Sequence, residues 1–157
     1  MHGKLTVGLF ATLCLLCNFS FVFGKAVKGD LGIGVNYPGV GVRYFLSNKV
    51  SLELKGQIEK NIVVGGLRGY YYFKSEEKFL PFAGLEADFI TFKGNDSKGT
   101  GLAGELFIGG EYYFNKKFSF QLDLGPALVS LKDKDTSESV NGLEYVVNFA
   151  VNYYFGK

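Results

Sequence analysis

The chain has 157 residues, a length that suits one domain. Its 17 Lys and Arg nearly balance its 15 Asp and Glu, so no strongly basic surface favours nucleic acid as a partner. Aromatic residues make up 17% of the chain, whereas His occurs once and Trp is absent. A site built on several histidines is therefore excluded.

The first residues predict a secretory signal peptide. Lys4 gives a positive start, an uncharged run follows at 5–23, and the small residues Gly24 and Ala26 come next. We predict that residues 1–24 are the signal peptide, with cleavage as late as residue 26, and that 25–157 form the mature domain. An uncleaved anchor helix is the alternative, because the apolar run is long.

Removal of this segment would change the chemistry of the chain. It takes away Cys14, Cys17 and His2, which are the only cysteines and the only histidine. The mature chain then has no disulfide, no Cys-x-x-Cys metal or redox site and no imidazole base. We therefore expect no catalytic residues, no cofactor and no metal site.

From residue 31 onward, apolar and polar side chains alternate with a period of two, which is typical of β-strands. The last segment is the clearest, since Tyr145, Val147 and Phe149 share one face while Glu144 and Asn148 share the other. In chain order the pattern predicts eight strands, at residues 31–37, 39–46, 50–59, 62–73, 79–92, 102–114, 118–128 and 143–155.

The connections between these strands alternate in length. Residues 47–49, 74–78 and 115–117 are short and polar, as expected for tight hairpins at one end of a barrel. Residues 94–101 and 132–141 are longer and belong to the opposite end. This layout predicts an all-β fold, an eight-stranded antiparallel up-and-down transmembrane β-barrel.

The alternation alone does not say which face points outward. With the apolar faces outward, as in a membrane barrel, the charged residues gather in one lumen, where we expect a structural ion network. Its predicted members are Arg43, Glu53, Lys55, Glu59, Arg68, Glu86, Asp88, Glu105, Glu111, Asp123 and Glu144. The opposite orientation would make the chain a soluble periplasmic lipocalin-like carrier of an apolar ligand.

Aromatic residues favour the membrane orientation. The triplet Tyr-Tyr-Phe occurs three times with a spacing of 41 residues, each time where a strand reaches a short turn or the chain's end. Such residues concentrate at membrane–water interfaces. We predict that the middle tyrosines turn inward and that the others form an aromatic girdle facing lipid: Tyr71, Phe73, Tyr112, Phe114, Tyr153 and Phe155.

Over residues 26–157 the chain resembles the small eight-stranded outer-membrane proteins of the OmpA/OmpX type. The most specific feature is the last strand, which alternates apolar residues up to a final aromatic, Phe155, with only two residues after it. In that family such a strand is associated with recognition by the barrel-assembly machinery. The resemblance implies a monomer in the bacterial cell outer membrane, in contact with outer-membrane lipid.

The predicted lumen residues include three bases and eight acids, and we expect them to pair inside a barrel too narrow for an open channel. The excess of acids leaves a narrow cation-passing pore as an alternative. We therefore expect a cell-envelope protein with a filled polar lumen and a structural or surface-interaction role, without catalysis. The loops at 94–101 and 132–141 are the expected contact regions.

Overall fold

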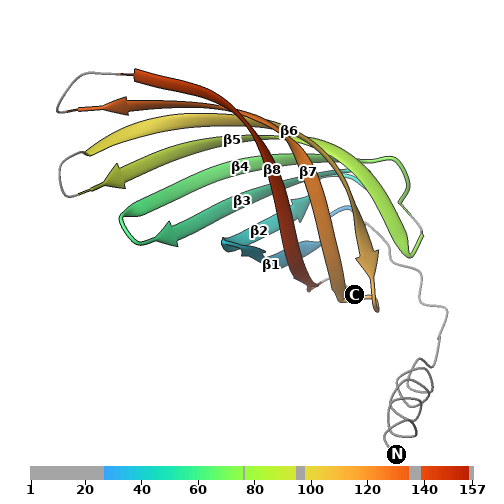
Figure 1. The fold of residues 1–157 in the computed structure, drawn as a ribbon. Helices are drawn as coiled ribbons and strands as arrows, with labels where there is room; N and C mark the ends of the chain where they lie inside the picture. The colour runs from blue at the N-terminus through green and yellow to red at the C-terminus, as the bar shows by residue number, and fades with distance from the viewer. Residues whose placement is uncertain (1–26, 76, 95–97, 135–138, 156–157) are drawn as a thin grey trace, which may run out of the picture.

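The computed structural model describes residues 27–75, 77–94, 98–134 and 139–155, and the predicted signal peptide lies outside these ranges. Within them the chain forms eight strands around a common interior (Figure 1). The strands are β1 (Leu31–Tyr37), β2 (Gly39–Phe45), β3 (Val50–Glu59), β4 (Ile62–Tyr72), β5 (Phe79–Lys93), β6 (Lys98–Tyr113), β7 (Phe118–Asp133) and β8 (Ser139–Tyr154). No helix in the described ranges is long and apolar enough to cross a membrane.

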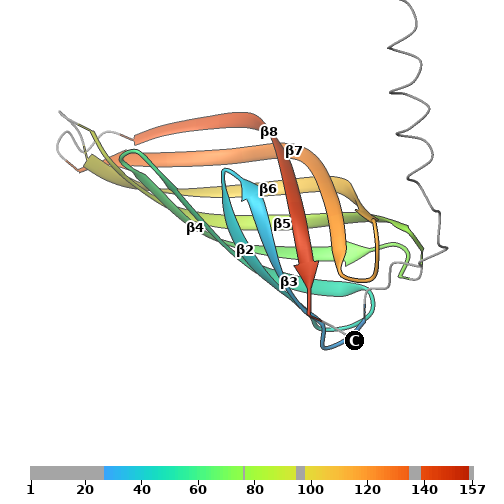
Figure 2. The same ribbon diagram turned by 90° about the horizontal axis from the view of Figure 1, so that it is seen from below.

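Each strand pairs antiparallel with the next one along the chain, and β8 pairs with β1, so the sheet closes on itself (Figure 1 and Figure 2). The closing ladder runs from Gly32 opposite Tyr154 to Tyr37 opposite Phe149. Closure pairs backbone groups that an open sheet would leave free at its two edges. The predicted fold class, an all-β, eight-stranded antiparallel up-and-down barrel, is confirmed.

The two faces of the barrel wall carry opposite kinds of side chain. β7 shows the pattern, since Leu122 and Leu124 point outward and are exposed, whereas Gln121 and Asp123 point inward and are buried. The exposed large hydrophobic side chains occur on all eight strands. The outer surface is therefore apolar, and the interior holds the buried charged groups.

An aromatic cluster fills the interior near the short turns, which we call the short-turn end. Phe82 contacts Tyr70, Tyr72 and Phe107 edge to face, and Tyr70 contacts Phe107 in the same way, with ring centroids 5.3–6.1 Å apart. Edge-to-face contacts at these distances are favourable beyond the area they bury. The packed rings close the lumen at this end and surround the charged groups described below.

Polar side chains fix two of the short turns. The Asn115 Oδ1 accepts hydrogen bonds from the backbone N–H groups of Lys117 and Phe118, at 2.8 and 2.9 Å. The Ser47 Oγ accepts a hydrogen bond from the Val50 N–H at 3.0 Å. Side chains of this kind replace backbone partners in tight turns and so hold the register of the flanking strands.

The strands differ greatly in length: β1 and β2 have 7 residues each, whereas β6, β7 and β8 have 16 each. The predicted long loops at 94–101 and 132–141 are wrong in part, because β6, β7 and β8 extend into them. Thr100 pairs with Lys132, which in turn pairs with Ser139. The other predicted strand boundaries agree with the structure to within one residue.

A reversal of polarity explains this error. Beyond Leu128 on β7, the outward positions are Ser130 and Lys132, while the inward positions Val129 and Leu131 are apolar. The alternation continues in these extensions, but with polar residues outside. A prediction that relies on apolar outward residues therefore leaves out the extensions of β6, β7 and β8.

Candidate functional site: the ion network in the lumen

The predicted lumen residues come from β2 to β8, and the structure brings most of them together. Two of them, Lys55 and Asp88, are half-buried. Glu59 and Glu144 lie in exposed parts of β3 and β8 and take no part in the ion pairs described below. The seven buried members are Arg43, Glu53, Arg68, Glu86, Glu105, Glu111 and Asp123.

Arg43 of β2 is the cationic centre closest to the short-turn end. Its Nε and Nη2 donate to the Glu53 Oε2 at 2.8 and 2.5 Å, and Nη2 also donates to the Gln121 Oε1 at 2.6 Å. Its Nη1 donates to the Tyr72 hydroxyl at 2.9 Å and to the Glu111 Oε2 at 3.3 Å. Nη1 also donates to the Tyr154 hydroxyl at 3.1 Å, so the planar guanidinium links β2 to five other strands, as its fixed fork of donors allows.

Glu111 of β6 is completely buried and collects neutral donors. It accepts hydrogen bonds from the hydroxyls of Tyr72 at 2.9 Å and Tyr154 at 2.5 Å, and from the Asn152 Nδ2 at 3.1 Å. The Ser119 hydroxyl donates to the same carboxylate. These partners are necessary because a carboxylate loses its hydration when it is buried. Without hydrogen bonds or a cation to replace that hydration, the free-energy cost would be large.

Arg68 of β4 is the second cationic centre. Its Nη2 donates to the Asp123 Oδ1 at 2.7 Å, and its Nε lies 2.7 Å from the Glu86 Oε2. The Lys55 Nζ donates to the other oxygen of Glu86, also at 2.7 Å. The Arg68 guanidinium lies 4.1 Å from the centre of the Phe107 ring, a favourable cation–π distance.

The ring of Tyr70 lies close to both arginines. The guanidinium carbon of Arg43 lies 4.0 Å from the ring centre, and that of Arg68 lies 5.3 Å from it. The Tyr70 hydroxyl donates to the Glu53 Oε2 at 3.0 Å. Two cations are therefore held in one narrow lumen by an aromatic ring that both approach and by the carboxylates around them. We call the following set the ion plug: Arg43, Glu53, Arg68, Glu86, Glu111 and Asp123.

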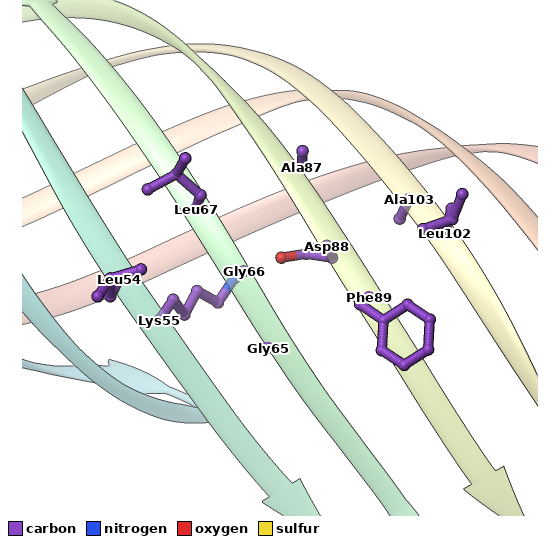
Figure 3. A pocket seen from close by; sticks show the side chains of 10 residues that line it. All are labelled: Leu54, Lys55, Gly65, Gly66, Leu67, Ala87, Asp88, Phe89, Leu102 and Ala103. Carbon is purple, nitrogen blue, oxygen red and sulfur yellow. The ribbon is translucent and has the colours of Figure 1, made fainter.

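Asp88 and Glu105 lie farther from the short-turn end and are less tightly paired. Asp88 and Lys55 both point toward Gly66 (Figure 3), and a Cβ at that position would sit 1.9 Å from the Asp88 Oδ1. Glu105 accepts hydrogen bonds from the Asn148 Nδ2 at 3.3 and 3.4 Å. We call the end of the barrel opposite the short-turn end the upper end. Asp88 and Glu105 lie on the upper side of the ion plug.

An open hollow of about 590 Å³ borders Lys55 and Asp88, and its other lining residues are Gly, Ala, Leu and Phe of β3 to β6, some of which, such as Phe89 and Leu102, belong to the outer face (Figure 3). Across the described ranges, no group of three or more His, Cys, Asp or Glu is arranged to hold a metal ion. The charged groups of the ion plug are instead engaged with one another. Chemically, this arrangement is suited to closing the lumen.

The charged residues of the site are predictable from the sequence, but several of their uncharged partners are not among the predicted residues. Asn36 of β1 donates to the Glu53 Oε1 at 2.8 Å, and Ser119 and Tyr70 bind carboxylates as described above. For Ser119 and Tyr70 the signal is their position on the inward face, two residues from the polar Gln121 and the charged Arg68 respectively. Their hydroxyl and amide groups complete the network.

The three Tyr-Tyr-Phe triplets lie at the short-turn ends of β4, β6 and β8. Their middle tyrosines, Tyr72, Tyr113 and Tyr154, point inward and are buried. The remaining two rings of each triplet lie on the outer surface and contact each other at 5.1–5.8 Å between centroids. Four of these outer residues are exposed and two, Tyr112 and Tyr153, are half-exposed. The exposed ones are Tyr71, Phe73, Phe114 and Phe155.

Comparison with known proteins identifies the architecture. No protein-family model matches the chain, and no curated protein matches it. The chain is similar in structure to the N-terminal β-barrel domain of Pseudomonas aeruginosa OprF, with a TM-score of 0.56 and 21% sequence identity, over 82% of this chain and 98% of that one. At this identity the likeness concerns the fold. The resemblance to small eight-stranded barrels is therefore confirmed at that level: the chain has the β-barrel fold of this OprF domain.

Proposed function

We propose that the chain is an integral protein of the bacterial outer membrane, with a lumen filled by the ion plug and a structural or surface-interaction role in the cell envelope, without catalysis. The observation that carries this proposal is the polarity of the barrel. Large apolar side chains are exposed on all eight strands, while charged side chains are buried inside. Only a hydrocarbon surrounding makes that distribution favourable.

The apolar exterior has the height of a bilayer core. On β8 the outward residues are apolar from Tyr153 up to Leu143, and the next outward residue is Asn141. About ten residues of a strand tilted by about 40° rise about 25 Å, which is the usual height of the lipid-facing band. We call this surface the apolar belt. Its upper boundary on the other long strands is marked by the last apolar outward residues Phe89, Leu102 and Leu128.

The alternative functions fit this geometry less well. A soluble carrier of an apolar ligand needs an apolar interior, whereas the interior here contains two buried arginines and their carboxylate partners. A cation-passing pore needs a continuous polar path, whereas Arg43 and Arg68 cross the lumen beside fully buried aromatic rings. Both observations favour a closed barrel as the functional form.

The proposal includes two further partners. The last strand ends in outward apolar residues at every second position, up to Phe155, and we propose that the barrel-assembly machinery recognises it. Outer-membrane lipid covers the apolar belt. We propose a monomer, because β1 and β8 pair with each other over the lower half of the barrel and leave no free edge there.

A charge in the belt tests the proposal directly. Val147→Arg places a cation on the outer face of the belt, where it costs about 2–4 kcal/mol, and the loss of folding into phospholipid vesicles is measured by heat-modifiable migration on SDS gels. Ser130→Arg is the matched control, because Ser130 points outward above the belt boundary, where the cost is about 0–1 kcal/mol. Equal folding of both variants would mean that the outer face does not meet lipid.

A further inference from the structure

The barrel wall is incomplete above the short β1–β2 hairpin. The ladder between β8 and β1 ends where Phe149 lies opposite Tyr37, although β8 itself begins at Ser139. On the other side, β2 pairs with β3 only as far as Gly56, and β3 continues to Glu59. Between residues 139–148 of β8 and 57–59 of β3 the described chain has no strand, as the short β1 and β2 beside the long β8 show (Figure 2). We call this region the wall gap.

The wall gap lies at the level of the apolar belt. The belt reaches Leu143 on β8, six residues beyond Phe149, so the lower part of the gap faces the hydrocarbon layer. The described side chains along its edges are strongly exposed. The three most exposed large hydrophobic residues of the described chain all flank the gap: Ile58 at 83%, Tyr145 at 80% and Tyr37 at 79%.

The edge of β8 at the gap offers hydrogen-bonding groups. The Phe155 N–H donates to the Leu31 carbonyl, which shows that alternate residues of β8 direct their backbone groups toward β1. Higher on the same strand, Val147, Tyr145 and Leu143 continue this series with no β1 residue opposite. Hydrocarbon does not satisfy such groups. An occupant of the gap therefore needs polar groups as well as apolar surface.

The inner wall behind the gap is largely apolar, although Glu144 of β8 and Glu59 of β3 occupy inward, exposed positions at its two edges. Ile90, Val129 and Val146 point inward and are only half-buried, in contrast to the fully buried ion plug below them. Leu131 lies flat on the wall, since a Cβ at Gly101 would sit 2.4 Å from its Cδ2. The upper interior thus presents a largely apolar surface that the described side chains leave partly exposed.

We propose that a membrane lipid occupies the wall gap, with a hydrocarbon chain along this inner wall and its polar linkage groups against the free edge of β8. The inference rests on the proposed membrane location. A second copy of the chain does not fit, because two copies inserted in the same direction present tilted β8 edges that cross each other rather than pair. The lipid supplies apolar contact inside and, through the oxygens of its linkage groups, acceptors for the N–H groups at the edge.

Single tryptophans test this proposal, because the chain contains none of its own. Val146→Trp points inward at the gap, and Val147→Trp, its neighbour, points outward at the same height. Phe107→Trp is the interior control, in contact with the ion plug. Each variant is reconstituted in vesicles of dibrominated phosphatidylcholine, whose bromines quench tryptophan on contact, and folding is checked by heat-modifiable migration. Iodide added to unbrominated vesicles measures exposure to water.

We expect Val146→Trp to lose the same fraction of its emission to brominated lipid as Val147→Trp, while Phe107→Trp loses little. Quenching of Val147→Trp alone would agree with the proposed membrane location but would refute the proposal that a lipid occupies the wall gap. In that case, quenching of Val146→Trp by iodide indicates water in the upper interior, and protection from both quenchers indicates a protein segment there. Absence of bromine quenching at Val147→Trp would instead refute the proposed function.

Discussion

Removal of Arg43 tests whether the ion plug stabilises the barrel. The Nη2–Oε2 distance to Glu53 is 2.5 Å and the Nη1–Oε2 distance to Glu111 is 3.3 Å. At an effective dielectric constant of about 20, these separations correspond to gross attractions of about 7 and about 5 kcal/mol. Most of this attraction offsets the cost of burying the charges. The relevant quantity is therefore the penalty for leaving two carboxylates without their cation.

For Arg43→Met we expect the free energy of unfolding in urea to fall by about 3–5 kcal/mol, as is usual when one partner of a buried pair is removed. The measurement uses protein folded in vesicles, with tyrosine fluorescence and heat-modifiable migration as readouts. Lys74→Met is the matched control. It removes an ion pair of similar length, 2.8 Å to Glu77, but both side chains are more than half exposed, so the expected loss is about 0–1 kcal/mol.

The double variant Arg43→Met, Glu53→Gln sharpens the test. Neutralising Glu53 removes one of the two unpaired charges, so the double variant should be more stable than Arg43→Met alone. If Arg43→Met costs no more than Lys74→Met, the buried network does not stabilise the fold, and the reasoning about the ion plug is refuted.

Two further predictions concern the tyrosines and the closed lumen. Tyr154→Phe removes a hydroxyl that binds the buried Glu111 carboxylate, so urea unfolding should show a loss of about 1.5–3 kcal/mol, whereas Tyr153→Phe on the outer surface should change little. In planar-bilayer recordings the unaltered barrel should show no resolved single-channel current. Arg68→Ala should open a small cation-selective conductance, because it removes the guanidinium that bridges Glu86 and Asp123.

These two predictions fail in different ways. Equal stability of the Tyr154→Phe and Tyr153→Phe variants would mean that the inward hydroxyl contributes nothing to the network. A steady cation current through the unaltered barrel would contradict the closed lumen. It would favour the alternative interpretation, a narrow cation-passing pore, which the excess of acids suggests.

The barrel fold was predictable from sequence because one physical rule governs most of it. Residues two apart lie on one face of a strand, so the series Tyr145, Val147, Phe149 identifies an apolar face without further information. The same rule sends Asp123 and Glu111 inward. Because a closed barrel repeats this alternation in every strand, eight strands and their order follow from the pattern and from the short turns.

The parts that were not predictable depend on contacts between distant strands. Arg43 and Glu111 are 68 positions apart, and their pairing follows from the register and shear of the closed barrel rather than from local spacing. The upper extensions of β6 to β8 are not predicted as strands, because their outward residues, such as Thr100 and Ser130, are polar. The wall gap likewise arises from the unequal strand lengths, which become visible only when the pairing of β1 with β8 is known.

The most direct test of the central claim is the location of the protein in the cell. The full chain, expressed with its own N-terminal segment in a Gram-negative bacterium, is fractionated, and the membranes are washed with alkaline carbonate to remove peripheral proteins. An integral barrel with an apolar belt remains with the outer membrane after this wash and migrates differently on SDS gels before and after boiling. Recovery in the soluble periplasmic fraction would contradict the account.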